Sequence, residues 1–338
     1  MGTRRVRLIA VFLALGAMIP AAVLPMTTEL RAAPAAKPKV AGIFPGVVTD
    51  ADYNTLGFVA LRSVSSELGI EVAYSESVPV PDVERVMREY VDLKFTIIWT
   101  HGGQFISQTE KLAREFRTVV FIGEADAPLA ERPPGNLWVI DRNFHIGFYP
   151  IGALAAMLTQ SGKVAYVGGL TLPFSYSEVH AIRQALRDQR RPVEFKPVWV
   201  GDFNDPAKAR QVTDALIAEG ADVIMGSLNL GMLGVFEAVK ASPRRVWVTA
   251  KYTDKLSFAP QHYVTSVLYD FAGPLRAIVR KVGRGETSGY YPLGFDTGVG
   301  LQFPLRNVPQ PVSVAMRRLM ADLVAGKIKV VKDTTPIR

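Results

Sequence analysis

The residues of this sequence best suited to chemistry are aromatic rings and short polar side chains that follow apolar, β-branched runs. Aromatic rings offer flat apolar faces to a planar ligand, and Asn or Asp side chains can pair with its polar edge. The candidate ligand-binding residues are Asp50, Tyr53, Asn54, His101, Phe174, Phe203, Asn229, Tyr252, Tyr269 and Asp270. Any one of them is more often a core residue than a ligand contact, but their recurrence at the ends of predicted strands favours a binding cleft.

The four histidines do not form a metal-binding pattern, because none pairs with another ligand type at metal-ligand spacing. His101 directly follows an apolar run and precedes two glycines, which favours a place in the cleft. His145 and His180 are predicted to lie on the surface of a helix or loop.

Sequence motifs of common enzymes are missing. The sequence contains no G-x-G-x-x-G or G-x-x-x-x-G-K-[ST] phosphate loop and no G-x-S-x-G nucleophile elbow. Asp50 and Asp52 could form an acid/base pair, but Asp50 is better explained as a turn or N-cap acid before a helix. The sequence contains no cysteine, which excludes disulfides, a catalytic thiol and a lipid-anchoring cysteine. We therefore predict no enzyme activity, no catalytic residue, no metal site and no cofactor.

The first 36 residues are predicted to be a cleaved signal peptide. Arginines at positions 4, 5 and 7 precede an apolar run over residues 8–24, and small residues follow at positions 32, 33, 35 and 36. A membrane anchor is the alternative, but the run is about as short as spanning helices become and is interrupted by Gly16 and Pro20. We expect a soluble protein that is exported to the periplasm and carries no lipid.

The charge of the chain gives no sign of nucleic-acid binding. The formal net charge is +8, but residues 1–36 hold four arginines and one glutamate, which leaves +5 for the mature chain. Acidic residues are interspersed throughout, and no block of Lys and Arg with interleaved aromatic residues occurs. About 300 mature residues exceed what one core normally holds, so two domains are expected.

Apolar β-branched runs alternate with longer stretches of helical pattern. The predicted strands are Val40–Phe44, Glu71–Tyr74, Thr96–Thr100, Val119–Ile122, Leu137–Ile140, Val164–Val167, Val198–Val200, Val223–Met225, Val246–Thr249 and Tyr263–Tyr269. The predicted helices include Leu56–Glu67, Ser107–Glu115, Ile146–Leu158, Ala207–Glu219, Met232–Lys240 and Gly273–Val282. Short, nearly unbroken strands separated by helices indicate parallel sheets that are covered on both faces.

Two consecutive sets of these units predict an α/β protein with two doubly wound parallel-sheet lobes. Lobe 1 is predicted to contain residues 37–143 and 271–304, and lobe 2 residues 144–270 and 305–331. The chain would cross between the lobes more than once, so that several connections form a hinge. The tail after Val331 is predicted to be loose. Because ligands bind beyond the carboxyl ends of parallel strands, we expect the site in a cleft between the lobes.

Four sequence motifs resemble those of the basic membrane protein (BMP) family of ABC-importer solute-binding proteins. The resemblance runs from about Val40 to Ile328. The matching stretches are D-A-D-Y-N at 50–54, T-Q-S-G-K-V-A-Y-V-G-G at 159–169, D-F-N-D-P-A-K at 202–208 and A-E-G-A-D-V-I at 218–224. The resemblance implies the type I periplasmic binding fold, a small-molecule ligand, and transient contact at the inner membrane with the permease subunits of an importer.

The sequence departs from the nucleoside-binding members of this family at two positions. Tyr252 stands where those members carry an acid that holds ribose hydroxyls, and Tyr269 replaces a lysine. The resemblance therefore implies a planar heterocycle, such as a free purine base, rather than a nucleoside. The alternatives are a nucleoside-processing α/β hydrolase and a ligand-sensing module for a membrane receptor.

Overall fold

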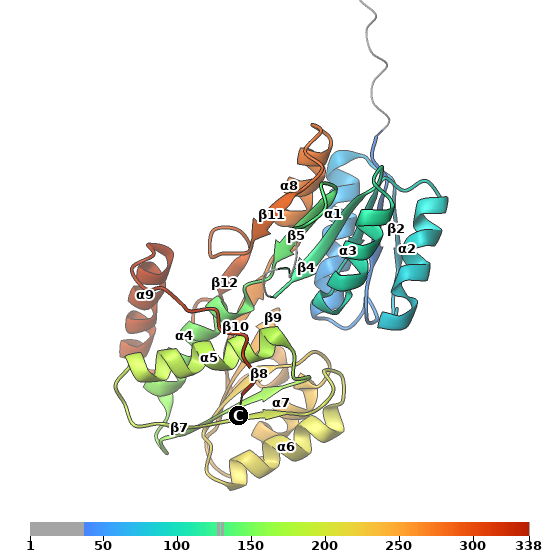
Figure 1. Ribbon diagram of the computed structural model, residues 1–338. Helices are drawn as coiled ribbons and strands as arrows, with labels where there is room; N and C mark the ends of the chain where they lie inside the picture. The colour runs from blue at the N-terminus through green and yellow to red at the C-terminus, as the bar shows by residue number, and fades with distance from the viewer. Residues whose placement is uncertain (1–36, 127–128, 130–131, 338) are drawn as a thin grey trace, which may run out of the picture. The chain divides into compact units, whose positions relative to one another are not determined.

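The computed structural model describes residues 37–126, 129 and 132–337. The predicted signal peptide, residues 1–36, lies outside these described residues. Within the described part of the chain, the helices and strands form two parallel-dominated sheets with helices on both faces (Figure 1). The α/β class and the two doubly wound sheets predicted from the sequence are therefore confirmed.

The first sheet has the strand order β11-β5-β4-β3-β1-β2, and all its pairs are parallel. Its strands are β1 (Val40–Ile43), β2 (Val72–Ser75), β3 (Ile97–Thr100), β4 (Val120–Ala125), β5 (Leu137–Asp141) and β11 (Gly289–Pro292). Its helices are α1 (Tyr53–Leu68), α2 (Val83–Asp92), α3 (Ile106–Glu115) and α8 (Ala272–Val282), with short 3₁₀ turns at Val80–Asp82 and Gly103–Phe105.

The second sheet has the order β12-β10-β9-β8-β6-β7, in which only the described β10–β12 pair is antiparallel. Its strands are β6 (Lys163–Gly168), β7 (Glu194–Trp199), β8 (Val223–Ser227), β9 (Trp247–Tyr252), β10 (Tyr263–Tyr269) and β12 (Val299–Leu301). Its helices are α4 (Phe144–Leu158), α5 (Pro173–Asp188), α6 (Pro206–Ala218), α7 (Met232–Ala241) and α9 (Gln310–Val324), with a 3₁₀ turn at Leu256–Phe258.

Alternate residues of the central strands bury against different helices, which is why these strands are largely apolar. In β3, Ile97 and Trp99 join the core that includes α1, whereas Ile98 joins the core beneath α2 and α3. In β6, Val164 and Tyr166 face the α4 and α5 side. Successive side chains of a strand point to opposite faces, so a sheet covered on both faces favours apolar residues at successive positions.

The chain passes between the two sheets three times, after β5, after β10 and after β11. In Figure 1 the orange strand β11 lies beside the green strand β5, where Gly289 pairs with Trp138 although they are far apart in sequence. Sheet membership differs from the predicted lobe limits at one point. Residues 299–301 were expected in lobe 1 but form β12, which pairs with β10 of the second sheet.

Two local expectations were wrong. The strand predicted at Val198–Val200 instead spans Glu194–Trp199. It lies at the edge of the sheet and its polar residues face outward, so its first residues do not form the apolar run by which strands were predicted. The tail after Val331 is not loose. Lys332 Nζ lies 2.5 Å from Asp141 Oδ1, and the backbone N–H of Val331 donates to Gln184 over 2.9 Å.

Among the described residues, no helix combines the length and the apolar character needed to cross a membrane.

Candidate ligand-binding cleft

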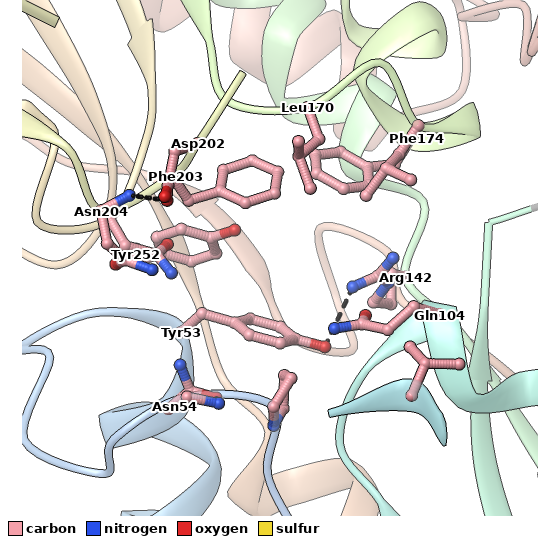
Figure 2. Close-up of a pocket in the computed structure, with 15 residues that line it drawn as sticks. Tyr53, Asn54, Gln104, Arg142, Leu170, Phe174, Asp202, Phe203, Asn204 and Tyr252 are labelled. Carbon is pink, nitrogen blue, oxygen red and sulfur yellow. Dashed lines mark hydrogen bonds between the residues drawn. The ribbon is translucent and has the colours of Figure 1, made fainter. Parts of the chain in front are cut away.

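A cavity of about 330 Å³ is lined by residues from the loops of both sheets (Figure 2). Its lining residues are Pro45, Gly46, Tyr53, Asn54, Val80, Gln104, Arg142, Leu170, Leu172, Phe174, Asp202, Phe203, Asn204, Asn229 and Tyr252. The cavity lies where the strand order reverses in each sheet, because Pro45 follows β1, Leu170 follows β6 and Asn229 follows β8. Such reversals at the carboxyl ends of parallel strands are the usual ligand sites of open α/β sheets.

The structure brings six of the ten predicted site residues together in the cavity wall. They are Tyr53, Asn54, Phe174, Phe203, Asn229 and Tyr252. The other four lie outside the lining. His101 is fully buried behind Tyr53, and Tyr269 is buried against Phe144 with a centroid distance of 4.6 Å. Asp270 is exposed and accepts the backbone N–H of Ala272 at the start of α8.

Asp50 organises the loop before α1 rather than lining the cavity. Its carboxylate accepts the backbone N–H groups of Asp52, Asn54 and Thr55 at 2.9–3.2 Å. It also accepts the side-chain amide of Asn54 at 2.7 Å. Asn54 Oδ1 in turn accepts the N–H of Gly46. Asp50 therefore holds the Asn54 amide at the cavity wall, which agrees with its interpretation as a turn acid.

The aromatic wall contributed by the second sheet is held by a glycine. A Cβ atom at Gly169 would lie 2.1 Å from the ring of Phe203, so the ring rests directly on the glycine backbone. Phe174 stacks beside Phe203 with a centroid distance of 6.0 Å and an interplanar angle of 21°. Figure 2 shows both rings on one side of the pocket and Tyr53 on the other. The second glycine of the G-G pair in the T-Q-S-G-K-V-A-Y-V-G-G motif thus supports the aromatic wall.

The opposite wall, Tyr53, is fixed by a buried polar chain. Its ring stacks on His101 at 3.9 Å, and its hydroxyl donates to Glu124 and accepts from Arg142 Nη1 at 3.0 Å. His101 Nδ1 faces Glu124 Oε1 at 2.6 Å, and Nε2 faces the carbonyl oxygen of Tyr53 at 2.8 Å. Both histidine nitrogens therefore lie within hydrogen-bonding distance of oxygen acceptors, which fixes the orientation of the ring. Burial would raise the pKa of Glu124, but His101, Arg142 and the Tyr53 hydroxyl together hold it below its usual range.

Arg142 is a cavity residue that the sequence reasoning missed. It directly follows β5, so the strand-end rule applied to the other candidates would have found it. Its Nε donates to Asp126 Oδ1 at 2.7 Å, and its Nη2 pairs with the other oxygen of the same carboxylate. Burial would lower the pKa of Arg142, but Asp126 and the other nearby groups raise it well above its usual range. The cavity therefore contains a permanent, rigidly held positive charge.

Tyr252 lines the cavity in an unusual backbone conformation. Its φ is +76°, and the N–H of Thr253 donates to the carbonyl oxygen of Lys251 at 3.1 Å. A positive φ with a hydrogen bond from residue i+2 to residue i describes a γ-turn, which is strained in a bulky residue. Burial raises the pKa of Tyr252 well above its usual range, so the phenol is neutral. The Tyr269 ring supports it from behind at 5.7 Å.

A buried ion pair lies behind this wall. Lys251 Nζ is 2.5 Å from Glu178 Oε1, and both side chains are fully buried. The ammonium lies 3.8 Å from the centroid of the Phe144 ring and 4.7 Å from that of Phe174. Burial lowers the pKa of Lys251 to about 8, although Glu178 acts in the opposite direction. Lys251 and Glu178 neutralise each other within the protein, so we interpret this ion pair as a support of the cavity wall.

His145 was predicted to lie on the surface, and that prediction was wrong. It is buried in α4, and its Nδ1 has no hydrogen-bond partner among the described residues. Burial and the nearby Lys332 lower its pKa to about 4.

Among the described residues, no group of three or more His, Cys, Asp or Glu side chains could hold a metal ion.

Two doubly wound sheets of this kind are also found in solved solute-binding proteins. A solved ABC transporter solute-binding protein from Conexibacter woesei matches this fold with a TM-score of 0.70 at 23% sequence identity. The match covers 87% of this chain and 99% of that chain.

Residues 37–317 match the Bmp family, described as ABC transporter substrate-binding protein PnrA-like, and the chain belongs to this family. The family predicted from the sequence motifs is thereby confirmed. The purine-binding protein of Brucella abortus is 22% identical over 300 residues, 86% of this chain and 82% of that protein. Basic membrane protein A2 of Borrelia garinii is 23% identical over 237 residues, 69% of each chain.

Proposed function

We propose that this protein binds a planar heterocycle, such as a free purine base, in the cavity and delivers it to the permease of an ABC importer from the periplasm. The observation that carries the proposal is the pair of aromatic walls, Phe203 on Gly169 and Tyr53 on His101, which come from different sheets and face one cavity. Flat apolar faces on both sides suit a planar ring. The purine-binding relative from Brucella abortus supports this ligand class.

The size and chemistry of the cavity favour a base over its nucleoside. About 330 Å³ is near the lower end of the usual range for ligand pockets. Tyr252 stands where nucleoside-binding members of the family carry an acid, and its neutral phenol offers no charge to ribose hydroxyls. A charge-assisted hydrogen bond contributes roughly 1.5–3 kcal/mol, whereas an aromatic contact adds about 0.5–1.5 kcal/mol beyond burial.

Calorimetry on protein freed of copurified ligand tests the proposal. Hypoxanthine and inosine form one pair of probes, adenine and adenosine a second pair, and glucose is the comparison of another class. We expect at least one base to bind, and each base that binds to do so more tightly than its nucleoside. Binding of glucose with no binding of any purine would contradict the ligand class. Tighter binding of the nucleosides would contradict the argument from Tyr252.

A further inference from the structure

Arg142 is a buried cation in the cavity wall with unused hydrogen-bonding capacity. A guanidinium has five N–H donors. Three of them have partners among the described residues, two at Asp126 and one at the Tyr53 hydroxyl. Arg142 is only 3% exposed, yet it lines the cavity. Figure 2 shows it beside the Tyr53 hydroxyl at the pocket.

The surroundings of this guanidinium are apolar and fixed. Its carbon lies 4.8 Å from the Phe144 ring centroid, 5.1 Å from that of Phe174 and 5.6 Å from that of Tyr53. A Cβ atom at Gly103 would lie 2.5 Å from Nη2, so the glycine leaves the space that this group occupies. Hydrogen bonds from an ionised donor are stronger than neutral ones, and a low local dielectric strengthens them further.

The hydrogen-bonding groups around Arg142 favour an acceptor on the ligand. The Tyr53 hydroxyl proton is already donated to Glu124. Asp202 is the one carboxylate among the described lining residues, and it accepts the N–H of Asn204 at 2.7 Å. An amino group placed against Arg142 would therefore meet N–H donors, whereas a carbonyl oxygen would accept from them.

We propose that Arg142 donates to a carbonyl oxygen, or to the corresponding oxyanion, on the ligand ring, so that the cleft selects oxo-substituted over amino-substituted heterocycles. This inference rests on the proposed function and names the substrate class within it. The oxygen would complete the donor set of a guanidinium that Asp126 and Tyr53 already hold in place. Arg142 is then the residue that determines specificity at this end of the ring.

The test compares hypoxanthine, which carries a ring carbonyl, with adenine, which carries an amino group, and with unsubstituted purine. We expect the unmodified protein to bind hypoxanthine more tightly than adenine by about 10- to 100-fold, because one ligand satisfies a buried donor and the other leaves it unpaired. Unsubstituted purine should bind with intermediate affinity. This comparison requires no variant.

Variants assign the selectivity to Arg142. Arg142→Gln leaves the Asp126 carboxylate without its cation, so the double variant Arg142→Gln with Asp126→Asn removes both charges together. We expect either variant to reduce hypoxanthine binding and to bring the two affinities within about threefold of each other. Arg245→Gln is the matched control, because Arg245 is exposed and does not line the cavity.

The outcomes separate this inference from the proposed function. Equal or tighter binding of adenine by the unmodified protein overturns the inference and leaves the heterocycle proposal standing. Persistence of the hypoxanthine preference in a folded variant overturns the assignment to Arg142. Failure of all three purines to bind overturns the proposed function, and the inference with it.

Discussion

Lys255 Nζ lies 2.7 Å from Asp52 Oδ1, and the two residues belong to loops of different sheets. Asp52 precedes α1 and Lys255 follows β9, and both side chains are almost fully buried. The Lys255 ammonium and the Thr253 hydroxyl also donate to the carbonyl oxygen of Ala51, at 3.3 and 3.2 Å. Beside the cavity, therefore, the two halves of the protein are joined by polar contacts that must break if the cleft opens.

Removal of this contact should favour an open cleft. Burial raises the pKa of Asp52 to about 7 and Lys255 opposes that rise, so Lys255→Met leaves an acid that takes up a proton and has no cationic partner. We expect a larger radius of gyration in small-angle scattering without ligand, a decrease on adding ligand, and about 3- to 30-fold weaker binding, since a buried contact of the closed form is lost.

Lys240→Met is the control for this variant, because Lys240 forms an exposed pair with Glu237 on α7. Scattering curves of Lys255→Met identical to those of the unmodified protein, with and without ligand, would show that the contact does not control closure.

The support of Phe203 by Gly169 gives a second prediction. Phe203→Ala should weaken ligand binding by more than about tenfold, or about 1.4 kcal/mol, because the ligand loses one aromatic face. Gly169→Ala should have a similar effect, since its methyl group would displace the ring. Gly300→Ala is the control, because a Cβ atom there meets no atom within 4 Å. Unchanged affinity in Gly169→Ala, measured by calorimetry, would exclude this role for the ring.

The identity of residue 252 should set the preference between base and nucleoside. Tyr252→Asp restores an acid at the position where nucleoside-binding members of the family have one, and Asp tolerates the positive φ of +76° better than Tyr. We expect the affinity ratio of inosine to hypoxanthine to rise by about tenfold or more, since an ionised acceptor becomes available to the ribose hydroxyls.

Tyr269→Phe serves as the control for residue 252. It removes a hydroxyl that donates to the Phe144 carbonyl oxygen at 3.3 Å but keeps the supporting ring. The explanation through residue 252 fails if Tyr252→Asp and Tyr269→Phe show the same ratio of nucleoside to base affinity.

His145 should make the protein less stable in mild acid. Its pKa is lowered from 6.5 to about 4 by burial and by Lys332, so the unfolded chain takes up a proton at a higher pH than the native protein. The stabilising contribution is therefore complete above pH 6.5 and is lost as the pH falls from 6.5 to 4. The shift corresponds to about 3 kcal/mol. Urea unfolding at pH 7 and pH 4.5 measures it.

His145→Gln should flatten this pH dependence, and His262→Gln should preserve it. His262 differs from His145 in having a hydrogen-bond partner, because its Nδ1 donates to the Val246 carbonyl oxygen at 2.8 Å. An unchanged slope in His145→Gln would assign the acid sensitivity to other groups.

The alternation of apolar runs and helical stretches in the sequence determined the two sheets and most of their strands. The strand predicted at Tyr263–Tyr269 coincides with β10. This prediction succeeded because a strand covered on both faces is mostly apolar, which is a property of the local sequence. The rule that ligands bind beyond strand ends also located Tyr53, Asn54, Phe174, Phe203, Asn229 and Tyr252 at one cavity.

Only the tertiary structure decided which strand-end residues reach the cavity. Tyr252 and Tyr269 both end strands, yet the strained turn at Tyr252 places it in the wall, while Tyr269 packs behind it against Phe144. The structure likewise decided that His145 is buried and that β12 joins the second sheet. Each of these facts depends on contacts between residues far apart in sequence, and the energy of such contacts leaves no periodic pattern in the local sequence.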